Sequence, residues 1–368
     1  MIDHRLLLNT SGAGKTRLML EGLCDEWGLY FTCRSGVDNI GSSDIQSITG
    51  FKSDLAEKYG YLQECGGFSR EIPLDHSDRA LLLTRNAQCT NRFFQAAITA
   101  RILSFLLFLD AAQDHKEVPT QVKKKIWTLV QTNSQLLSWD DQPFSDLFSQ
   151  LTAVLCHGDP EILRGATVEI LNSCLEHIKA NSLRCVIDEA QTAAETLPKA
   201  FHSTGEKPKH RPVLRALLAK WMSFQLGFVI TGTSLNRDIV ADALSSTVGK
   251  QPGIQTGITD VGKLFGPSDV RLYLEKYLDP EDIQNIARGE LVRRACYWLT
   301  GRPRFTASYI EYLLHHGLKN PHRVLTKYID HLTKFTPNDG EAWERMEVTK
   351  LTWEVGYPPR PFDFERIQ

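Results

Sequence analysis

The feature that most constrains the fold is the stretch LLLNTSGAGKTRLMLEGL, residues 6–23 of the 368-residue chain. An apolar run that ends at Leu8 is followed by a loop of small residues and then by a helical pattern. A short apolar run of this kind is typical of a strand that is buried on both faces of a parallel sheet. The stretch therefore predicts a strand, a Gly-containing turn and a helix over residues 15–24.

The loop follows the phosphate-binding pattern G-x-x-x-x-G-K-[ST], in which backbone N–H groups face the phosphates, the lysine reaches their β and γ oxygens and the hydroxyl holds Mg²⁺. Asn9 stands in place of the first glycine, and asparagine tolerates left-handed backbone geometry better than most residues. A chance G-K-T in a surface loop is the alternative, but such a copy would rarely fall between a strand and a helix. Lys15 is expected to act in catalysis as well as in binding. The predicted nucleotide ligands in the loop are Asn9, Thr10, Ser11, Gly12, Ala13, Gly14, Lys15, Thr16 and Arg17.

A second motif, VIDEA at residues 186–190, places two acids at the end of an apolar run. Asp188 is expected to hold Mg²⁺ together with Thr16, and Glu189 to act as the general base that polarises the attacking water. The alternative is a strand that ends in solvent with two exposed acids, and this pattern is common when it is taken by itself. Its combination with the phosphate loop favours the catalytic interpretation.

Polar residues also end the next apolar run, ITGTSLN at residues 230–236. A hydroxyl or amide there is expected to contact the γ-phosphate or the attacking water, and Thr233 is the candidate for this contact. The alternative is that these residues only end the strand, as Thr and Ser often do. An arginine is expected to neutralise charge in the transition state, and Arg304 is the retained candidate. Further candidates for this role are Arg211, Arg215, Arg237 and Arg302. For each arginine, the alternative is an ordinary position on the protein surface.

The periodicity of the chain predicts an α/β core that is interrupted by a large helical insertion. The insertion covers residues from about 51 to 180, and a Gly-rich passage at 249–266 precedes a second helical region. The predicted domains are thus an α/β core over 1–265 and a helical domain over 266–368. The apolar runs that predict further strands cover residues 29–33, 183–191 and 226–236.

The composition is that of a soluble globular protein, with 42% hydrophobic and 23% charged residues and a formal net charge of −2. Such a balance gives no case for nucleic acid or a membrane as a partner. The longest apolar stretch, residues 102–112, is too short to cross a bilayer and is expected to be a core helix with Ile98, Ile102, Phe105 and Leu109 on one face. Without a signal segment or a membrane span, a cytoplasmic or nuclear location is expected.

In chain order, NTSGAGKT, VIDEAQ, ITGTS and LTGRPR resemble the motifs of additional-strand ATPases, in particular AAA+ and STAND-type ATPases with a helical or winged-helix lid. In that resemblance residues 231–234 form the end of the sensor strand, and Gly301 with Pro303 matches a G-x-P element that approaches the nucleotide from the lid. The phosphate loop followed by WGLYFTC resembles the P-loop module of fungal and oomycete Crinkler-type proteins. Those proteins usually carry an N-terminal ubiquitin-like header, and whether this chain is a fragment that lacks one is left open.

The resulting hypothesis is an ATPase that uses ATP and Mg²⁺ and whose turnover drives a conformational switch. A non-hydrolysing nucleotide switch or scaffold is the first alternative, and a phosphotransferase is a less favoured one. A GTPase is disfavoured because the chain has no N-K-x-D motif, and a helicase because it has a single phosphate loop. A protein partner of unknown identity is expected, and self-association is left open. A nuclease-coupled effector would rest on family analogy, which does not establish function.

Overall fold

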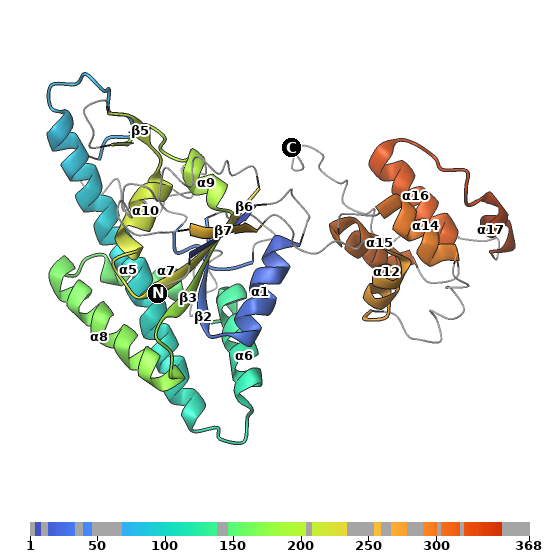
Figure 1. The fold of residues 1–368 in the computed structure, drawn as a ribbon, viewed down its shortest axis with the longest axis horizontal. Helices are drawn as coiled ribbons and strands as arrows, with labels where there is room; N and C mark the ends of the chain where they lie inside the picture. Colours follow the sequence, from blue (N-terminus) through green and yellow to red (C-terminus); the bar gives the residue numbers. More distant parts are fainter. Residues whose placement is uncertain are drawn as a thin grey trace. The chain divides into compact units, whose positions relative to one another are not determined.

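The structure is a computed structural model of the chain (Figure 1). Two compact units divide the chain, the first formed by residues 1–9 and 15–259 and the second by residues 10–14 and 260–368. The residues that the structure describes are 4–8, 14–33, 40–45, 68–137, 146–203, 208–233, 254–258, 266–277, 290–299, 303–316 and 320–347.

The first unit is built on a five-stranded sheet with the strand order β2-β3-β6-β1-β7, and all neighbouring strands pair in parallel (Figure 1). Every residue of β2 and β6 is buried, as expected of strands that are covered on both faces. The α/β class is therefore confirmed. β7 lies inside the Gly-rich passage, where no strand was predicted. The strands are β1 (His4–Leu8), β2 (Gly28–Thr32), β3 (Leu183–Asp188), β6 (Leu226–Gly232) and β7 (Ile254–Ile258).

The strand register brings four strand ends to one edge of the sheet. Leu8 at the end of β1 pairs with Gly232 at the end of β6, and Thr32 at the end of β2 pairs with Asp188 at the end of β3. β6 itself lies between β1 and β3. Residues that follow these strands therefore share the carboxyl edge of the sheet, which is where open α/β sheets bind ligands.

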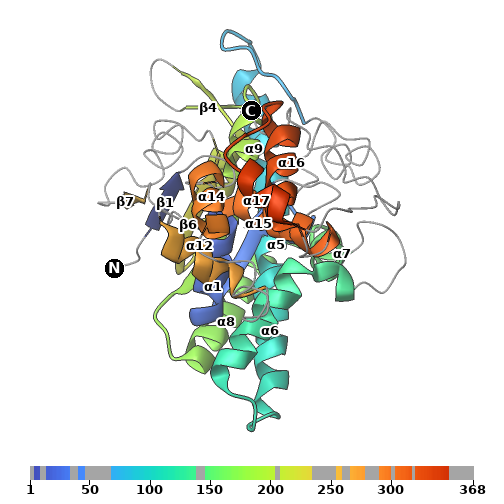
Figure 2. The ribbon, with the colours of Figure 1, turned by 90° about the vertical axis from the view of Figure 1, so that its right-hand side faces the viewer.

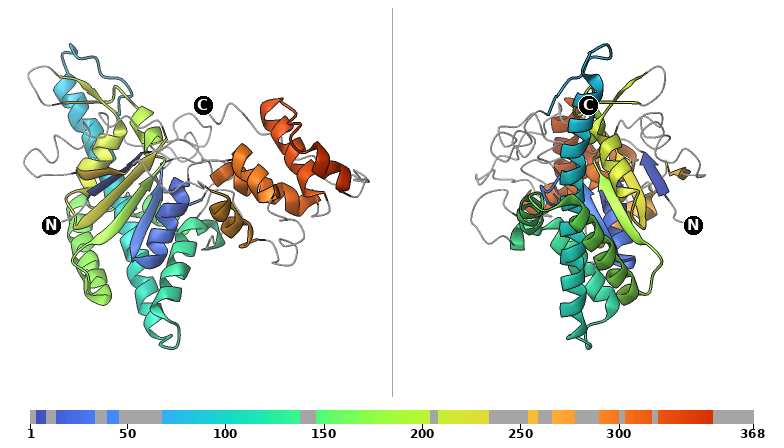
Figure 3. Two further views of the ribbon diagram at one scale, coloured as in Figure 1. Left: turned by 45° about the vertical axis from the view of Figure 1, so that its right-hand side comes forward. Right: turned by 90° about the vertical axis from the view of Figure 1, so that its left-hand side faces the viewer.

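Helices cover both faces of this sheet (Figure 3). On one face α1 (Lys15–Asp25) packs through Leu23 against Tyr30, Val186 and Val229. On the other face α10 (Val213–Trp221) and the inserted helices form the main core with the strands. Between β3 and α10 the chain forms α9 (Ala190–Glu195) and two short antiparallel strands, β4 (Phe201–His202) and β5 (His210–Arg211).

The predicted insertion between β2 and β3 is largely helical where the structure describes it. Asp146 and Asp159 accept hydrogen bonds from the first backbone N–H groups of α7 and α8, which fixes where these two helices begin. Residues 51–67 and 138–145 of the insertion lie outside the described residues. Its helical segments are α5 (Arg79–Gln113), α6 (Thr120–Thr132), the 3₁₀ helix η1 (Ser134–Leu137), α7 (Leu147–Leu155) and α8 (Pro160–Ile178).

The long helix α5 is the core helix that the sequence predicted. Ile98, Ile102 and Phe105 are completely buried, and Leu109 is nearly so. In the described part of the chain, α5 is the one helix long and apolar enough to cross a membrane, and 72% of that apolar window is buried inside the protein. A helix that is buried in this way is part of a protein core.

The second unit, whose helices are drawn in orange and red in Figure 2, has a hydrophobic core of its own. Leu299, Tyr309, Leu313 and Leu325 are buried there together. All regular elements in the described ranges of this unit are helices. These helices are α12 (Pro267–Leu274), α14 (Glu290–Leu299), α15 (Pro303–His316), α16 (Pro321–Thr333) and α17 (Glu341–Met346).

A buried ion pair ties the inserted helices to the sheet. Arg101 of α5 pairs with Asp44, and both side chains are inaccessible to solvent. The Arg101 guanidinium also donates to the backbone carbonyl of Tyr30 at 2.7 Å and lies 3.8 Å from the ring centroid of Phe148. The pair thus contacts β2, α5 and α7 at once.

Replacing Arg101 by methionine is expected to lower the free energy of unfolding by about 3–5 kcal/mol, because Asp44 then stays buried without its charged partner. Urea unfolding followed by tryptophan fluorescence measures this loss. The double variant Arg101→Met with Asp44→Leu is expected to recover part of it, since no buried charge is left. A double variant whose loss equals the sum of the two single losses would show that the pair is not coupled.

Candidate functional site

The described part of the predicted phosphate loop lies at the start of α1. Gly14 has a φ of +88°, a backbone region that favours glycine. Lys15 is the first residue of α1, and its side chain is only 6% exposed. The first N–H groups of a helix have no partner within that helix and form a site for anions. The predicted ligands that lie outside the described residues are Asn9, Thr10, Ser11, Gly12 and Ala13.

Arg17, the last predicted ligand of the loop, forms an ion pair on its own helix. Its Nε lies 2.8 Å from a carboxylate oxygen of Glu21, and both side chains are exposed. Pairs at this spacing on a helix surface contribute a few tenths of a kcal/mol. A role of Arg17 in nucleotide binding stays a prediction.

A hydrogen bond joins the two motifs that the sequence singled out. The hydroxyl of Thr16, the second residue of α1, donates to Oδ2 of Asp188 at 2.8 Å. Asp188 is the last residue of β3 and is separated from Thr16 by 172 positions in the chain. The fold therefore brings together the two side chains that were predicted to hold Mg²⁺.

The Asp188 carboxylate is buried and accepts two further hydrogen bonds. The hydroxyl of Tyr30 on β2 donates to Oδ2 at 3.0 Å, and the backbone N–H of Glu189 donates to Oδ1 at 2.9 Å. Burial raises the pKa of Asp188, the Thr16 hydrogen bond opposes that rise, and the neighbouring Glu189 carboxylate adds to it. A cation beside Asp188 would favour the ionised form of this carboxylate.

Glu189 stands at a sharp change of chain direction between β3 and α9. Its backbone is left-handed, with φ 52° and ψ 36°, which is uncommon for a residue with a side chain. The side-chain amide of Gln191 contacts it: Nε2 donates to Oε2 of Glu189 at 2.5 Å. The predicted base is thus held by a specific neighbour on the first turn of α9.

The end of β6 lies next to this acid pair. The backbone N–H of Thr233 donates to Oε1 of Gln191 at 3.1 Å, so Gln191 bridges Thr233 and Glu189. Thr231 is completely buried, and its hydroxyl has no hydrogen-bond partner within the ranges that the structure describes. Ser234 and the residues that follow it to 250 lie outside the described residues.

The candidate arginines are distributed over both units. Arg211 lies in β5 and Arg215 on α10, whereas Arg237 and Arg302 fall outside the described residues. Pro303 and Arg304 begin α15 of the second unit, which is described by itself. The catalytic role of Arg304 and the nucleotide contact of Pro303 therefore stay predictions.

No family model, curated protein or solved structure matches this chain. The described residues contain no group of three or more His, Cys, Asp or Glu side chains that could hold a metal ion. A site of one carboxylate and one hydroxyl is nevertheless the usual protein share of a Mg²⁺ site, since Mg²⁺ keeps waters and takes substrate phosphates as its other ligands.

Sequence reasoning did not identify Tyr30 and Gln191 as members of the site. The signal for Tyr30 was a phenol in the apolar run 29–33 that was predicted to be a strand, since a buried tyrosine hydroxyl usually finds a hydrogen-bond partner. Gln191 was part of the VIDEAQ motif but had no role assigned. The partners of both side chains depend on which strands are neighbours, and periodicity does not reveal this.

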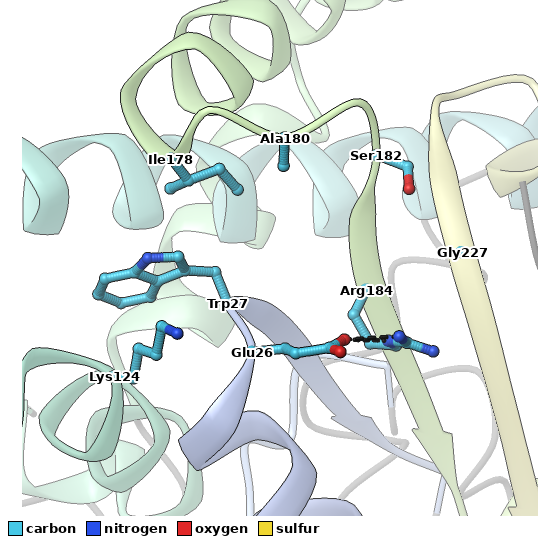
Figure 4. A pocket seen from close by; sticks show the side chains of 8 residues that line it. All are labelled: Glu26, Trp27, Lys124, Ile178, Ala180, Ser182, Arg184 and Gly227. Carbon is cyan, nitrogen blue, oxygen red and sulfur yellow. Dashed lines mark hydrogen bonds and ion pairs between the residues drawn. The ribbon is translucent and has the colours of Figure 1, made fainter. Parts of the chain in front are cut away.

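A cavity of about 330 Å³ lies at the other edge of the same sheet (Figure 4). Glu26, Arg184 and Gly227 line it, and they stand at or near the amino ends of β2, β3 and β6. Its charged groups have partners: Arg184 pairs with Glu26 at 2.5 Å, and Lys124 Nζ donates to the Asp25 carbonyl at 2.6 Å. This cavity is distinct from the edge that carries Asp188.

Proposed function

We propose that the protein binds ATP with Mg²⁺ and hydrolyses it, and that turnover drives a conformational switch. The observation that carries the proposal is the 2.8 Å hydrogen bond from Thr16 to Asp188. It links the helix that begins within the G-K-T sequence to the strand that ends at Asp188, which Glu189 follows. In phosphate-loop NTPases a hydroxyl and a carboxylate in these two positions hold Mg²⁺ beside the β- and γ-phosphates.

The strand order supports a phosphate-loop core of the additional-strand class. β6 lies between β1, which precedes the phosphate loop, and β3, which ends in Asp188. This is the additional strand that the resemblance to AAA+ and STAND-type ATPases leads us to expect. In this position the polar end of β6, with Thr233, is next to both motifs and can contact the terminal phosphate.

The residues of the site have different roles in the proposed reaction. Lys15 and the first amides of α1 bind the phosphates, and Thr16 and Asp188 are the Mg²⁺ ligands. When bound, Mg²⁺ neutralises charge on the β- and γ-phosphates. Glu189 accepts a proton from the water that attacks the γ-phosphorus and so makes that water a better nucleophile.

The second unit is proposed to act as a helical lid that responds to the bound nucleotide. This follows the resemblance of LTGRPR to the lid element of AAA+ and STAND-type ATPases, and Arg304 would then stabilise charge in the transition state. A protein partner of unknown identity would respond to the conformational switch, as in a Crinkler-type module. A cytoplasmic or nuclear location is proposed for the protein. If a neighbouring copy supplies the arginine, the rate per subunit rises with protein concentration.

A non-hydrolysing nucleotide switch is the second candidate function. Asn9 in place of the first glycine of the loop favours it, because that departure weakens the match to hydrolysing relatives of the motif. The adjacent acids of the D-E pair argue for water as the acceptor, and hence against a phosphotransferase. Binding without phosphate release would favour the switch.

ATP binding is expected to tighten at least about tenfold in the presence of Mg²⁺, since a metal ion held by Asp188 would add a contact to the phosphates. Isothermal titration calorimetry with ATP, in Mg²⁺ and then in EDTA, measures the effect. Asp188→Asn is expected to lose most of it, whereas the control Asp110→Asn, at an exposed position on α5, retains it. Equal ATP affinities in Mg²⁺ and in EDTA for the parental protein would contradict the proposed metal site.

A further inference from the structure

Gln191 forms a bridge between two strand ends that are distant in sequence. Its side-chain nitrogen donates to Oε2 of Glu189 at 2.5 Å, and its side-chain oxygen accepts from the backbone N–H of Thr233 at 3.1 Å. Thr233 follows β6 directly and is 42 positions away from Gln191 in the chain. Gln191 itself is half-buried on the first turn of α9.

The chemistry of the three groups fixes the orientation of the Gln191 amide. A backbone N–H can only donate, so the amide oxygen has to face Thr233. An ionised carboxylate can only accept, so the amide nitrogen has to face Glu189. Exchange of the two amide ends would break both hydrogen bonds. The bridge therefore has a single favourable arrangement when Glu189 is ionised.

The bridge also restricts the side-chain torsions of Glu189. A glutamate has three side-chain torsions, and fixing them costs conformational entropy. The backbone of Glu189 is left-handed at the point where β3 has ended and α9 has not yet begun. Glu189 is therefore part of neither a regular strand nor a regular helix. A charge-assisted hydrogen bond from Gln191 is strong enough to select one orientation of the carboxylate.

We propose that Gln191 is a positioning residue for the hydrolytic reaction: it holds the Glu189 carboxylate in its working orientation and ties that orientation to the position of the β6 end. This inference rests on the proposed ATPase function. Gln191 acts through Glu189 and is not itself required to touch the nucleotide. It accordingly affects turnover, and the affinity for ATP is unchanged.

The test is the variant Gln191→Met, which keeps the length of the side chain and removes both hydrogen bonds. Its kcat for Mg²⁺-dependent ATP hydrolysis is expected to fall about 10- to 100-fold, the usual cost of losing a group that orients a functional side chain, while ATP binding stays within twofold. A merely structural role would instead lower kcat and the affinity for ATP together.

Gln191→Glu is the second variant, since it keeps the shape of the side chain and an acceptor for Thr233. It places a like charge against Glu189 where the N–H donor was, so its kcat is expected to fall at least as far as that of Gln191→Met, with an ATP affinity within twofold of the parental value. Gln113→Met, at an exposed position on α5, is the matched control and is expected to keep the parental kcat and ATP affinity.

The outcomes separate this inference from the proposed function. Absence of phosphate release from the parental protein would overturn the ATPase itself. A parental protein that hydrolyses ATP, together with Gln191 variants of parental kcat, would overturn the positioning role and leave the ATPase intact. Equal losses of ATP affinity and kcat in both variants would also contradict it, since a positioning residue for the base acts on turnover.

Discussion

Glu189→Gln is expected to bind ATP with parental affinity and to release phosphate about 100-fold or more slowly than the parental protein. The amide keeps the shape of the side chain, so the contacts around it are little disturbed. It has no basic oxygen that can take a proton from the attacking water, so the chemical step loses its general base. Binding is unaffected because the phosphates are proposed to be held by α1 and by Mg²⁺.

The measurement is steady-state phosphate release beside a calorimetric titration with ATP. Glu195→Gln is the matched control, because Glu195 lies on the same short helix, α9, at an exposed position. It is expected to keep the parental rate. If Glu189→Gln released phosphate at the parental rate, the assignment of Glu189 as the base would be wrong.

Lys15→Ala is expected to weaken ATP binding about 100-fold or more, which corresponds to at least about 2.7 kcal/mol of binding free energy. Lys15 is the first residue of α1, and its charge is proposed to meet the β- and γ-phosphates together with the amides of the helix start. Charge-assisted hydrogen bonds in such a position are strong because little water competes for them.

Titration calorimetry with ATP and Mg²⁺ measures this loss, and thermal unfolding checks that the variant is folded. Lys116→Ala, at an exposed position between α5 and α6, is the control and is expected to bind ATP as the parental protein does. A folded Lys15→Ala protein that binds ATP within a few fold of the parental affinity would contradict a phosphate-binding role for this lysine.

Much of the core was predictable because it depends on local pattern. The run before the phosphate loop, the helix that begins at Lys15 and the strand that ends at Asp188 all follow from periodicity and from Gly and charged residues at their ends. The contact between Thr16 and Asp188 also follows, because helix starts and strand ends in a parallel sheet lie at one edge.

The remaining features depend on which segments become neighbours. Tyr30 reaches Asp188 only because β2 pairs with β3, and Gln191 reaches Thr233 only because β6 lies beside β3. The pairing of Arg101 with Asp44 likewise depends on how α5 packs against β2. The local sequence does not determine which segments become neighbours in the fold, so these contacts were not predicted.

β7 escaped prediction for a different reason. Its five residues, 254–258, lie in a Gly-rich passage, and glycine is depleted in strands because it adds no side chain to the packed surface. The strand is stabilised by its parallel pairing with β1, which is distant in the sequence. Tertiary pairing therefore overrides a weak local preference here.

The most direct test of the central claim is phosphate release by the parental protein, measured with ATP in the presence of Mg²⁺ and again in EDTA, beside the Glu189→Gln variant. The account predicts release that requires Mg²⁺ and that is lost in the variant. A parental protein that binds Mg²⁺ and ATP but releases no phosphate would contradict the proposed ATPase, and would identify the site as a nucleotide switch without turnover.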